Sequence, residues 1–257
     1  MTPLVNILLK AVIVLLTISF VNSGAAYAAV GQRRITVAAA SDLVFAMREI
    51  AADFEKETGI KTVISFGSSG AFAAQIRQGA PYDLFFSADA KIIMELLSAG
   101  FLMPDSVATY ARGRLALVSK ATEIAGLQGL RSFTAASGRI AIANPEHAPY
   151  GRAAVEAMKS AGVYEDVKDS LVYGENVAHA LTFVETGNAV AAIVALSVAR
   201  GSGIKAMPVD ASMHSPIMQA VGVLSNAKDK DAAAQFIKYV LGAKGRSKLK
   251  EYGFESS

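Results

Sequence analysis

The sequence predicts an α/β protein with two lobes, each a mostly parallel sheet flanked by helices. Short apolar runs of the kind found in strands covered on both faces alternate with stretches in which apolar residues recur at helical spacing. This alternation repeats with new material after about residue 110, so each half of the chain can build its own sheet. Ligands of such sheets bind at the carboxyl ends of the strands. We therefore expect a ligand site in the cleft between the two lobes.

The first 28 residues have the pattern of a secretory signal peptide. Lys10 precedes an apolar run over residues 11–21, and small residues ending in the triplet Ala26-Tyr27-Ala28 follow it. A membrane anchor is the alternative, but the run is short for a span and leads directly into cleavable residues. We expect cleavage after Ala28 and export of the mature chain.

Composition narrows the classes of partner. The 25 basic and 22 acidic residues give a net charge of only +3, which predicts neither a nucleic-acid partner nor a membrane-surface partner. The absence of cysteine excludes disulfides, thiolate metal sites and a lipoprotein anchor. The histidines His147, His179 and His214 show no spacing typical of zinc ligands, so we expect no bound metal cation.

In the first half of the chain, three strands each lead into a helix. Continuous apolar runs predict the strands at residues 35–40, 60–66 and 83–87. The helices that follow them are expected to stop at Gly59, Gly79 and Gly100.

The second half of the chain repeats this alternation of strands and helices. Strands are expected at residues 115–119, 139–143, 170–173, 190–196 and 204–209. The helices between them are expected to stop at Gly162 and Gly187. The chain is expected to end with a strand near 220–224 and helices over 231–241 and 243–252. The loop over 144–151 contains two prolines and a terminal glycine, which predicts a stiff connection.

Four strand-to-helix junctions carry the same local means of binding an anion. The start of a helix offers free N–H groups and the positive end of the helix dipole. The junctions place Ser41, Ser69, Tyr150 and Val177 at such points, two in each half. Ser41 is expected to cap its helix, and for Ser69 a role as N-cap alone is the competing interpretation. An exported protein in which such junctions converge, without a catalytic group, is a carrier rather than an enzyme.

Five stretches of the sequence carry a family resemblance. VAAASDLVFAM, SFGSSGAFAAQIRQGAPYDLFFSAD, IANPEHAPYGRAA, GENVAHALTFVETGNA and KEYGF resemble segments of the periplasmic molybdate-binding proteins of bacterial ABC importers, in the same order from about Ile35 to Phe254. The resemblance implies a two-lobed periplasmic binding protein type II fold with crossovers near Tyr110 and Met207. Lobe 1 would comprise residues 29–109 plus 208–257, and lobe 2 residues 110–207.

The resemblance also implies a function. The chain would capture molybdate, and tungstate with it, in the periplasm and deliver it to the permease of an inner-membrane ABC transporter. We expect a monomer without a cofactor, in which molybdenum is held only as the oxyanion. Hydroxyls and main-chain N–H groups would hold that oxyanion without a salt bridge.

The family's binding positions fall on four residues of this chain. Ser41 and Ser69 would each give a hydroxyl and an N–H, whereas Tyr150 and Val177 would give main-chain N–H groups. Many members place a further tyrosine where this chain has Ala195, so we infer that the Tyr150 hydroxyl supplies the missing donor.

Asp42 departs from the neutral residue that is common after the first serine. A carboxylate in the cleft would repel a dianion, so we expect Asp42 to point to solvent or to cap its own helix. If it faced the ligand instead, it could accept the proton of phosphate, which keeps a phosphate or sulfate binder as an alternative. A secreted serine hydrolase is a further alternative, with Ser41 or Ser69 as nucleophile and His147 as the nearest base.

Overall fold

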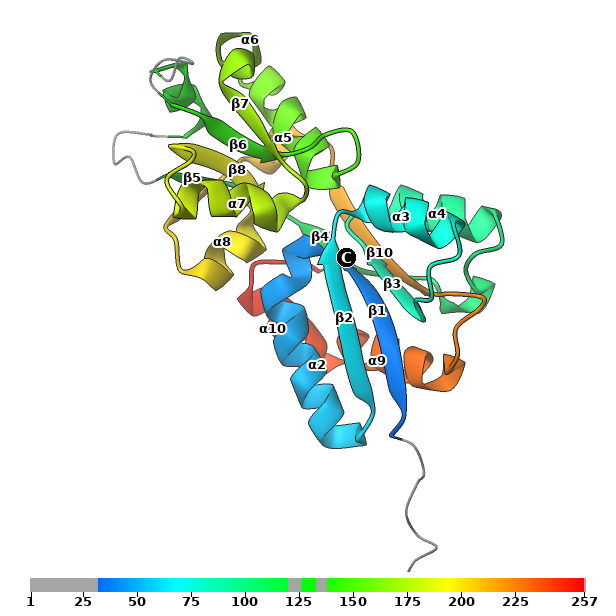
Figure 1. Cartoon of the computed structure of the whole chain (residues 1–257). Coiled ribbons are helices and arrows are strands. Elements are labelled where there is room, and N and C mark those ends of the chain that lie inside the picture. Colours follow the sequence, from blue (N-terminus) through cyan, green and yellow to red (C-terminus); the bar gives the residue numbers. More distant parts are fainter. Residues whose placement is uncertain (1–31, 120–125, 133–137, 257) are drawn as a thin grey trace, which may run out of the picture. The chain divides into compact units, whose positions relative to one another are not determined.

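The computed structural model describes residues 32–119, 126–132 and 138–256. The expected signal peptide over 1–28 therefore lies outside the described residues. Within the described part of the chain, no helix is both long and apolar enough to span a membrane. The described residues form two five-stranded sheets, each flanked by helices (Figure 1).

The first sheet has the strand order β2-β1-β3-β10-β4. Its strands are β1 (Arg34–Ala40), β2 (Lys61–Gly67), β3 (Leu84–Ser87), β4 (Ala108–Gly113) and β10 (Ile217–Val223). Its helices are α2 (Val44–Thr58), α3 (Ser69–Arg77), α4 (Ala90–Ser98), α9 (Lys230–Leu241) and α10 (Ala243–Glu251). β1 pairs in parallel with β2 and β3, while β10 runs antiparallel to both β3 and β4. We call this sheet with its helices lobe 1.

The second sheet repeats the arrangement in the order β7-β6-β8-β5-β9. Its strands are β5 (Leu115–Ser119), β6 (Ile140–Ala143), β7 (Leu171–Gly174), β8 (Ala191–Ala195) and β9 (Ala206–Pro208). Its helices are α5 (Pro149–Ser160), α6 (Tyr164–Val167), α7 (Val177–Glu185) and α8 (Leu196–Ser202). β6 pairs in parallel with β7 and β8, and β5 runs antiparallel to β8 and β9. This sheet with its helices is lobe 2.

The predicted α/β class with two helix-flanked sheets is confirmed, with one difference. Each sheet is mixed, because the strand that is fourth in its spatial order, β10 or β5, runs antiparallel to its neighbours. No crossover helix leads into these two strands, and parallel neighbours need such a crossover. β5 follows β4 after the single residue Arg114, and β10 returns from lobe 2 through a short loop. The chain thus passes between the sheets after Gly113 and again after Pro208, whereas the sequence placed the first crossover near Tyr110, inside β4. The helices α6 and α8 were not predicted.

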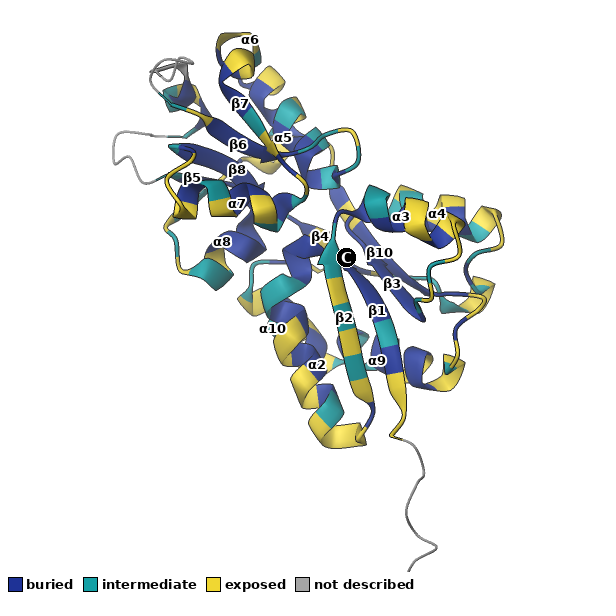
Figure 2. Cartoon of the chain, viewed as in Figure 1, coloured by how far each residue is buried: buried dark blue, intermediate teal, exposed yellow. Residues whose placement is uncertain are grey.

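Alternation along β1 divides the core of lobe 1 between the two faces of its sheet. Ile35, Val37 and Ala39 pack with residues of α2 and α9, whereas Ala38 packs on the opposite face with residues of α3 and α4. This is the period of two expected for a strand covered on both sides. Figure 2 shows the central strands in the buried colour, while β2, at the edge, is partly exposed. Lobe 2 is built around a further cluster of buried apolar residues, which also includes Ala40 and Ala88 of lobe 1.

The parallel register brings helix starts that are distant in the sequence to the same edge of each sheet. Ala40 at the end of β1 pairs with Gly67 at the end of β2, so the turn after β1 begins beside the start of α3. Ala143 pairs with Gly174 in the same way, which places the loop before α5 beside the start of α7. The carboxyl ends of the parallel strands therefore carry the four predicted junctions.

Candidate functional site

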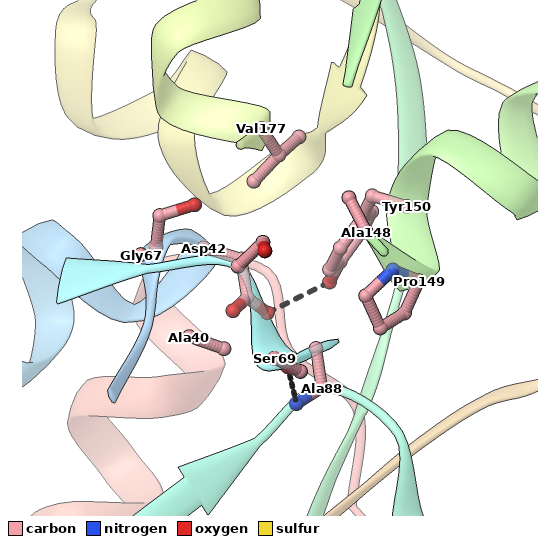
Figure 3. A pocket seen from close by; sticks show the side chains of 11 residues that line it. Ala40, Asp42, Gly67, Ser69, Ala88, Ala148, Pro149, Tyr150 and Val177 are labelled. Atoms are coloured by element: carbon pink, nitrogen blue, oxygen red, sulfur yellow. Dashed lines mark hydrogen bonds between the residues drawn. The ribbon is translucent and has the colours of Figure 1, made fainter. Parts of the chain in front are cut away.

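All four predicted binding residues line one small pocket. The pocket has an empty volume of about 200 Å³ and receives residues from both lobes. Its wall consists of Ala40, Ser41, Asp42, Gly67, Ser68, Ser69, Ala88, Ala148, Pro149, Tyr150 and Val177. Figure 3 shows Val177 and Tyr150 of lobe 2 facing the lobe 1 residues. The structure thus brings together residues that the sequence places up to 136 positions apart, Ser41 and Val177.

Ser41 is the first residue of a short 3-10 turn, Ser41–Leu43, which leads into α2. The prediction that its side chain caps the helix is wrong, because the capping position is Ala40 and no side chain caps this end. The Ser41 Oγ accepts a hydrogen bond from the N–H of Ala178 in lobe 2, at 3.5 Å. Its hydroxyl proton and its own N–H find no acceptor among the described residues, so both remain available to a ligand.

Ser68, which the sequence analysis did not single out, is the N-cap of α3. Its Oγ accepts from the N–H of Ala71 at 3.3 Å. Ser69 is the first residue of the helix, so the interpretation of Ser69 as the cap is wrong. The Ser69 Oγ accepts from the N–H of Ala88 at 2.9 Å, which leaves its proton free to donate (Figure 3). The Ser69 N–H likewise meets no acceptor in the described part of the chain.

Lobe 2 contributes two helix starts. Pro149 opens α5 and has no N–H, so Tyr150 carries the first N–H of that helix. Gly151 lets this helix approach the end of β6, because a Cβ there would lie 2.2 Å from the carbonyl oxygen of Ala143. Val177 opens α7, and the Asn176 side chain caps that helix by accepting from the N–H of His179. The N–H groups of Tyr150 and Val177 meet no acceptor among the described residues.

Asp42 is buried and no side chain caps its helix, so both parts of the expectation, that it points to solvent or caps its own helix, are wrong. Its side chain lines the pocket, and its Oδ2 accepts from the Tyr150 hydroxyl at 2.9 Å (Figure 3). The same oxygen accepts from Gln219 Nε2 at 2.6 Å. Burial raises the pKa of the Asp42 carboxyl to about 6, although the hydrogen bonds from Gln219 and Tyr150 oppose this shift. The other carboxyl oxygen, Oδ1, is buried and has no hydrogen-bond partner among the described residues.

The Tyr150 hydroxyl also differs from its expected role. It donates its only proton to Asp42 and accepts from Gln219 Nε2 at 3.0 Å, so in this arrangement it has no proton for a ligand. Burial, followed by the nearby Asp42 charge, raises the pKa of Tyr150 well above its usual value. Tyr150 therefore faces the pocket with its main-chain N–H as the available donor.

The buried partners of Asp42 were missed in the sequence. Gln219 lies on β10 and is held by the Tyr110 hydroxyl, which donates to its Oε1 at 2.6 Å. Gly113 makes room for this group, because a Cβ there would lie 2.1 Å from the Tyr150 hydroxyl oxygen. The one usable signal was a single glutamine inside the apolar run IMQAVGV, since a buried amide must have hydrogen-bond partners.

A second contact between the lobes lies beside the pocket. The His147 carbonyl of lobe 2 accepts from the N–H of Gly70 at 3.0 Å, and His147 Nδ1 lies 2.8 Å from Ser68 Oγ. A Cβ on Gly70 would lie 2.5 Å from that carbonyl oxygen, so only glycine permits this approach. His147 thus contacts Ser68, and neither Ser41 nor Ser69 has the basic partner that the hydrolase alternative requires.

We expect Gly70→Ala to weaken ligand binding about tenfold or more by keeping the lobes apart. The added methyl group would collide with the backbone of His147, whereas alanine is the better helix former, so α3 itself should not be weakened. Titration calorimetry measures the affinity, and small-angle scattering with saturating ligand measures the radius of gyration. Parent-like values in both measurements would show that this contact is not needed for closure.

The lining of the pocket contains no basic side chain. Among the described residues there is also no cluster of three or more His, Asp or Glu side chains that could hold a metal ion. The available groups are four main-chain N–H groups and two serine hydroxyls, which are hydrogen-bond donors suited to an anion. Two helix-flanked sheets with a donor-lined pocket at their strand ends define a solute-binding protein.

Comparison with known proteins gives the family. Residues 35–255 match the family described as bacterial extracellular solute-binding protein, and the chain belongs to this family. It is similar to the molybdate-binding protein ModA of Azotobacter vinelandii, with 37% identity over 227 residues that cover 86% of this chain and 89% of the relative. It is also similar to ModA of Rhodobacter capsulatus, with 34% identity over 221 residues that cover 86% and 87% of the two chains.

A solved structure supports the same relationship. The periplasmic molybdate-binding protein of Azotobacter vinelandii superposes with a TM-score of 0.81 at 32% identity, covering 87% of this chain and 99% of that one. The sulfate-binding protein SubI of Mycobacterium tuberculosis reaches a TM-score of 0.74 at 16% identity, which shows a shared fold alone. The resemblance that the sequence indicated is confirmed.

Proposed function

We propose that this protein captures molybdate, and tungstate with it, in the periplasm and delivers it to the permease of an ABC importer. The observation that carries the proposal is the convergence of free N–H donors at Ser41, Ser69, Tyr150 and Val177 on a pocket without a basic side chain. Curated relatives with 34–37% identity over most of their length are molybdate-binding proteins. The signal pattern over residues 1–28 supports export, and no cofactor or second copy of the chain is required.

The donors suffice energetically for tight binding. Four N–H groups and two serine hydroxyls can form six charge-assisted hydrogen bonds, each with a net contribution of about 1.5 to 3 kcal/mol. Association costs at least several kcal/mol, and a submicromolar dissociation constant corresponds to about 8 kcal/mol. Preorganised dipoles of the two lobes would thus replace the water around the dianion.

Selectivity would depend on the size of the cavity. Molybdate, tungstate and sulfate have the same charge and shape, so the distances between the donors must separate the larger ions from sulfate. Phosphate keeps a proton at neutral pH and needs an acceptor, which the donating serine hydroxyls and N–H groups do not provide. The Asp42 carboxylate in the pocket wall can accept that proton, so phosphate is the competing cargo.

A role as a binding protein without enzyme activity is the better interpretation of the site. His147 contacts the helix-capping Ser68 across the two lobes, and Ser41 and Ser69 accept hydrogen bonds from backbone N–H groups. A serine nucleophile would need a base within hydrogen-bond reach of its own oxygen.

Titration calorimetry of the mature chain against molybdate, tungstate, sulfate and phosphate tests the proposal. We expect submicromolar dissociation constants for molybdate and tungstate and at least a hundredfold weaker binding of sulfate and phosphate. Tighter binding of sulfate or phosphate would replace the proposed cargo by that anion. Absence of binding for all four would remove the oxyanion function altogether.

A further inference from the structure

The unpartnered oxygen of Asp42 is the feature that the proposed function does not explain. Asp42 is 1% exposed and lines the pocket, and in the part of the chain that the structure describes its buried Oδ1 has no hydrogen bond. A buried carboxylate oxygen without a donor is costly, and here it stands at a site proposed for a dianion. In Figure 3, the Asp42 oxygen that is not bonded to Tyr150 is turned away from that residue.

Among the described residues, no side-chain donor is left for Oδ1, although the main-chain N–H groups of Asp42 and Leu43 also lower the pKa of this carboxyl. The Tyr110 hydroxyl donates to Gln219 Oε1. The two protons on Gln219 Nε2 go to the Tyr150 hydroxyl oxygen and to Asp42 Oδ2, and the Tyr150 proton also goes to Oδ2. Every polar proton of the Tyr110, Gln219 and Tyr150 side chains is thus already donated.

Among the described residues, no cationic side chain compensates the carboxylate. The groups that face it from the surrounding elements are Tyr110 of β4, Tyr150 of α5 and Gln219 of β10, and the Ser197 hydroxyl of α8 donates to the Asp42 carbonyl oxygen. No cationic side chain is among the causes that shift the pKa of Asp42. The pKa values of Tyr110 and Tyr150 are raised well above their usual value, so neither tyrosine loses its proton near neutral pH.

A proton on Oδ1 would remove both the repulsion between the carboxylate and the dianion and the lack of a hydrogen bond at Oδ1. The carboxyl group would become neutral, so it would no longer repel a dianion, and Oδ1 would become a donor to one of the ligand's oxygens. Oδ2 would keep its two hydrogen bonds from Tyr150 and Gln219. The network is therefore compatible with the protonated acid without rearrangement.

We propose that Asp42 joins the binding shell as a neutral carboxylic acid, so that each molybdate dianion enters together with one proton taken up from solvent. The inference rests on the proposed oxyanion function and assigns Asp42 as a determinant of affinity and selectivity. No covalent bond changes, and the proton passes from water or buffer to Oδ1. Because the pKa of Asp42 without ligand is about 6, the Asp42 carboxyl of the free protein is mostly ionised at pH 7 to 8. Molybdate binding must therefore be accompanied by uptake of a proton from solvent.

Titration calorimetry in two buffers of different ionisation enthalpy counts the protons taken up with molybdate. We expect nearly one proton per molybdate at pH 8. Between pH 7 and pH 8.5, where molybdate is a dianion, the affinity should fall about tenfold per pH unit. Asp42→Asn, which is neutral at every pH, should take up no proton and bind with an affinity that does not change with pH. His147→Asn is the matched control, and it should keep the slope of the parent.

The outcomes separate this inference from the proposed function. Tight binding of molybdate by the parent without proton uptake and with a flat pH profile would overturn the role of Asp42 and leave the cargo unchanged. Loss of the slope in His147→Asn would also overturn it, because the proton would then belong to His147. If no oxyanion binds at any pH, the proposed function fails and the inference fails with it. The proton count of the parent decides the question even if Asp42→Asn does not fold.

Discussion

Ser41→Ala and Ser69→Ala should each weaken molybdate binding by about 1 to 3 kcal/mol, which is roughly five- to 150-fold in affinity. Both hydroxyl oxygens already accept a backbone N–H, so their protons are the part directed to a ligand. Removing one donor from a desolvated anion loses a charge-assisted hydrogen bond without adding bulk. Titration calorimetry at a fixed pH gives the dissociation constants, and thermal unfolding without ligand checks that the fold is retained.

Ser87→Ala provides the matched control for this pair. Ser87 is fully buried in the same lobe, and its hydroxyl donates to the Asp89 carbonyl oxygen outside the pocket wall. Its loss should change stability without changing molybdate affinity. If Ser41→Ala and Ser69→Ala bind as tightly as Ser87→Ala, these two hydroxyls serve only the packing of the strand-to-helix junctions.

Asp42→Asn should stabilise the ligand-free protein by about 3 kcal/mol at neutral pH and by almost nothing near pH 4. The folded protein holds the pKa of this acid at about 6, above its ordinary value of 3.8, so folding favours the protonated form. For such a group the folded state binds more protons than the unfolded chain between about pH 4 and pH 6. The contribution of Asp42 to the free energy of unfolding is therefore greatest at low pH, falls as the pH rises through this window, and stays constant above it.

Urea unfolding of parent and variant at a series of pH values measures this difference. Other groups titrate as well, such as Asp229, whose pKa is lowered to about 2 mainly by its hydrogen bond from Arg33. They contribute equally to both proteins and cancel in the difference between them. A stability difference that does not change between pH 4 and pH 7.5 would mean that the Asp42 carboxyl keeps an ordinary pKa in the folded state.

Local patterns in the sequence were enough to predict most helices and strands and the positions of the main donors. The apolar runs and helix-stopping glycines predicted most strands and helices, because burial on both faces and helix ends depend on neighbouring residues. Ser41, Ser69, Tyr150 and Val177 were found for the same reason. A helix start leaves its first N–H groups unpaired whatever the rest of the fold does.

The assembly of the sheets and the surroundings of Asp42 depend on long-range packing, which only the folded structure shows. The antiparallel insertion of β10 between β3 and β4 pairs segments more than 100 residues apart, which no local pattern encodes. The same strand brings Gln219, 177 positions from Asp42, to its carboxylate, and α5 brings Tyr150 from 108 positions away. Whether a side chain beside a helix start meets water or a buried partner depends on what packs over it. For that reason Asp42 was expected to face solvent or to cap its own helix and is instead a buried acid in the wall of the pocket.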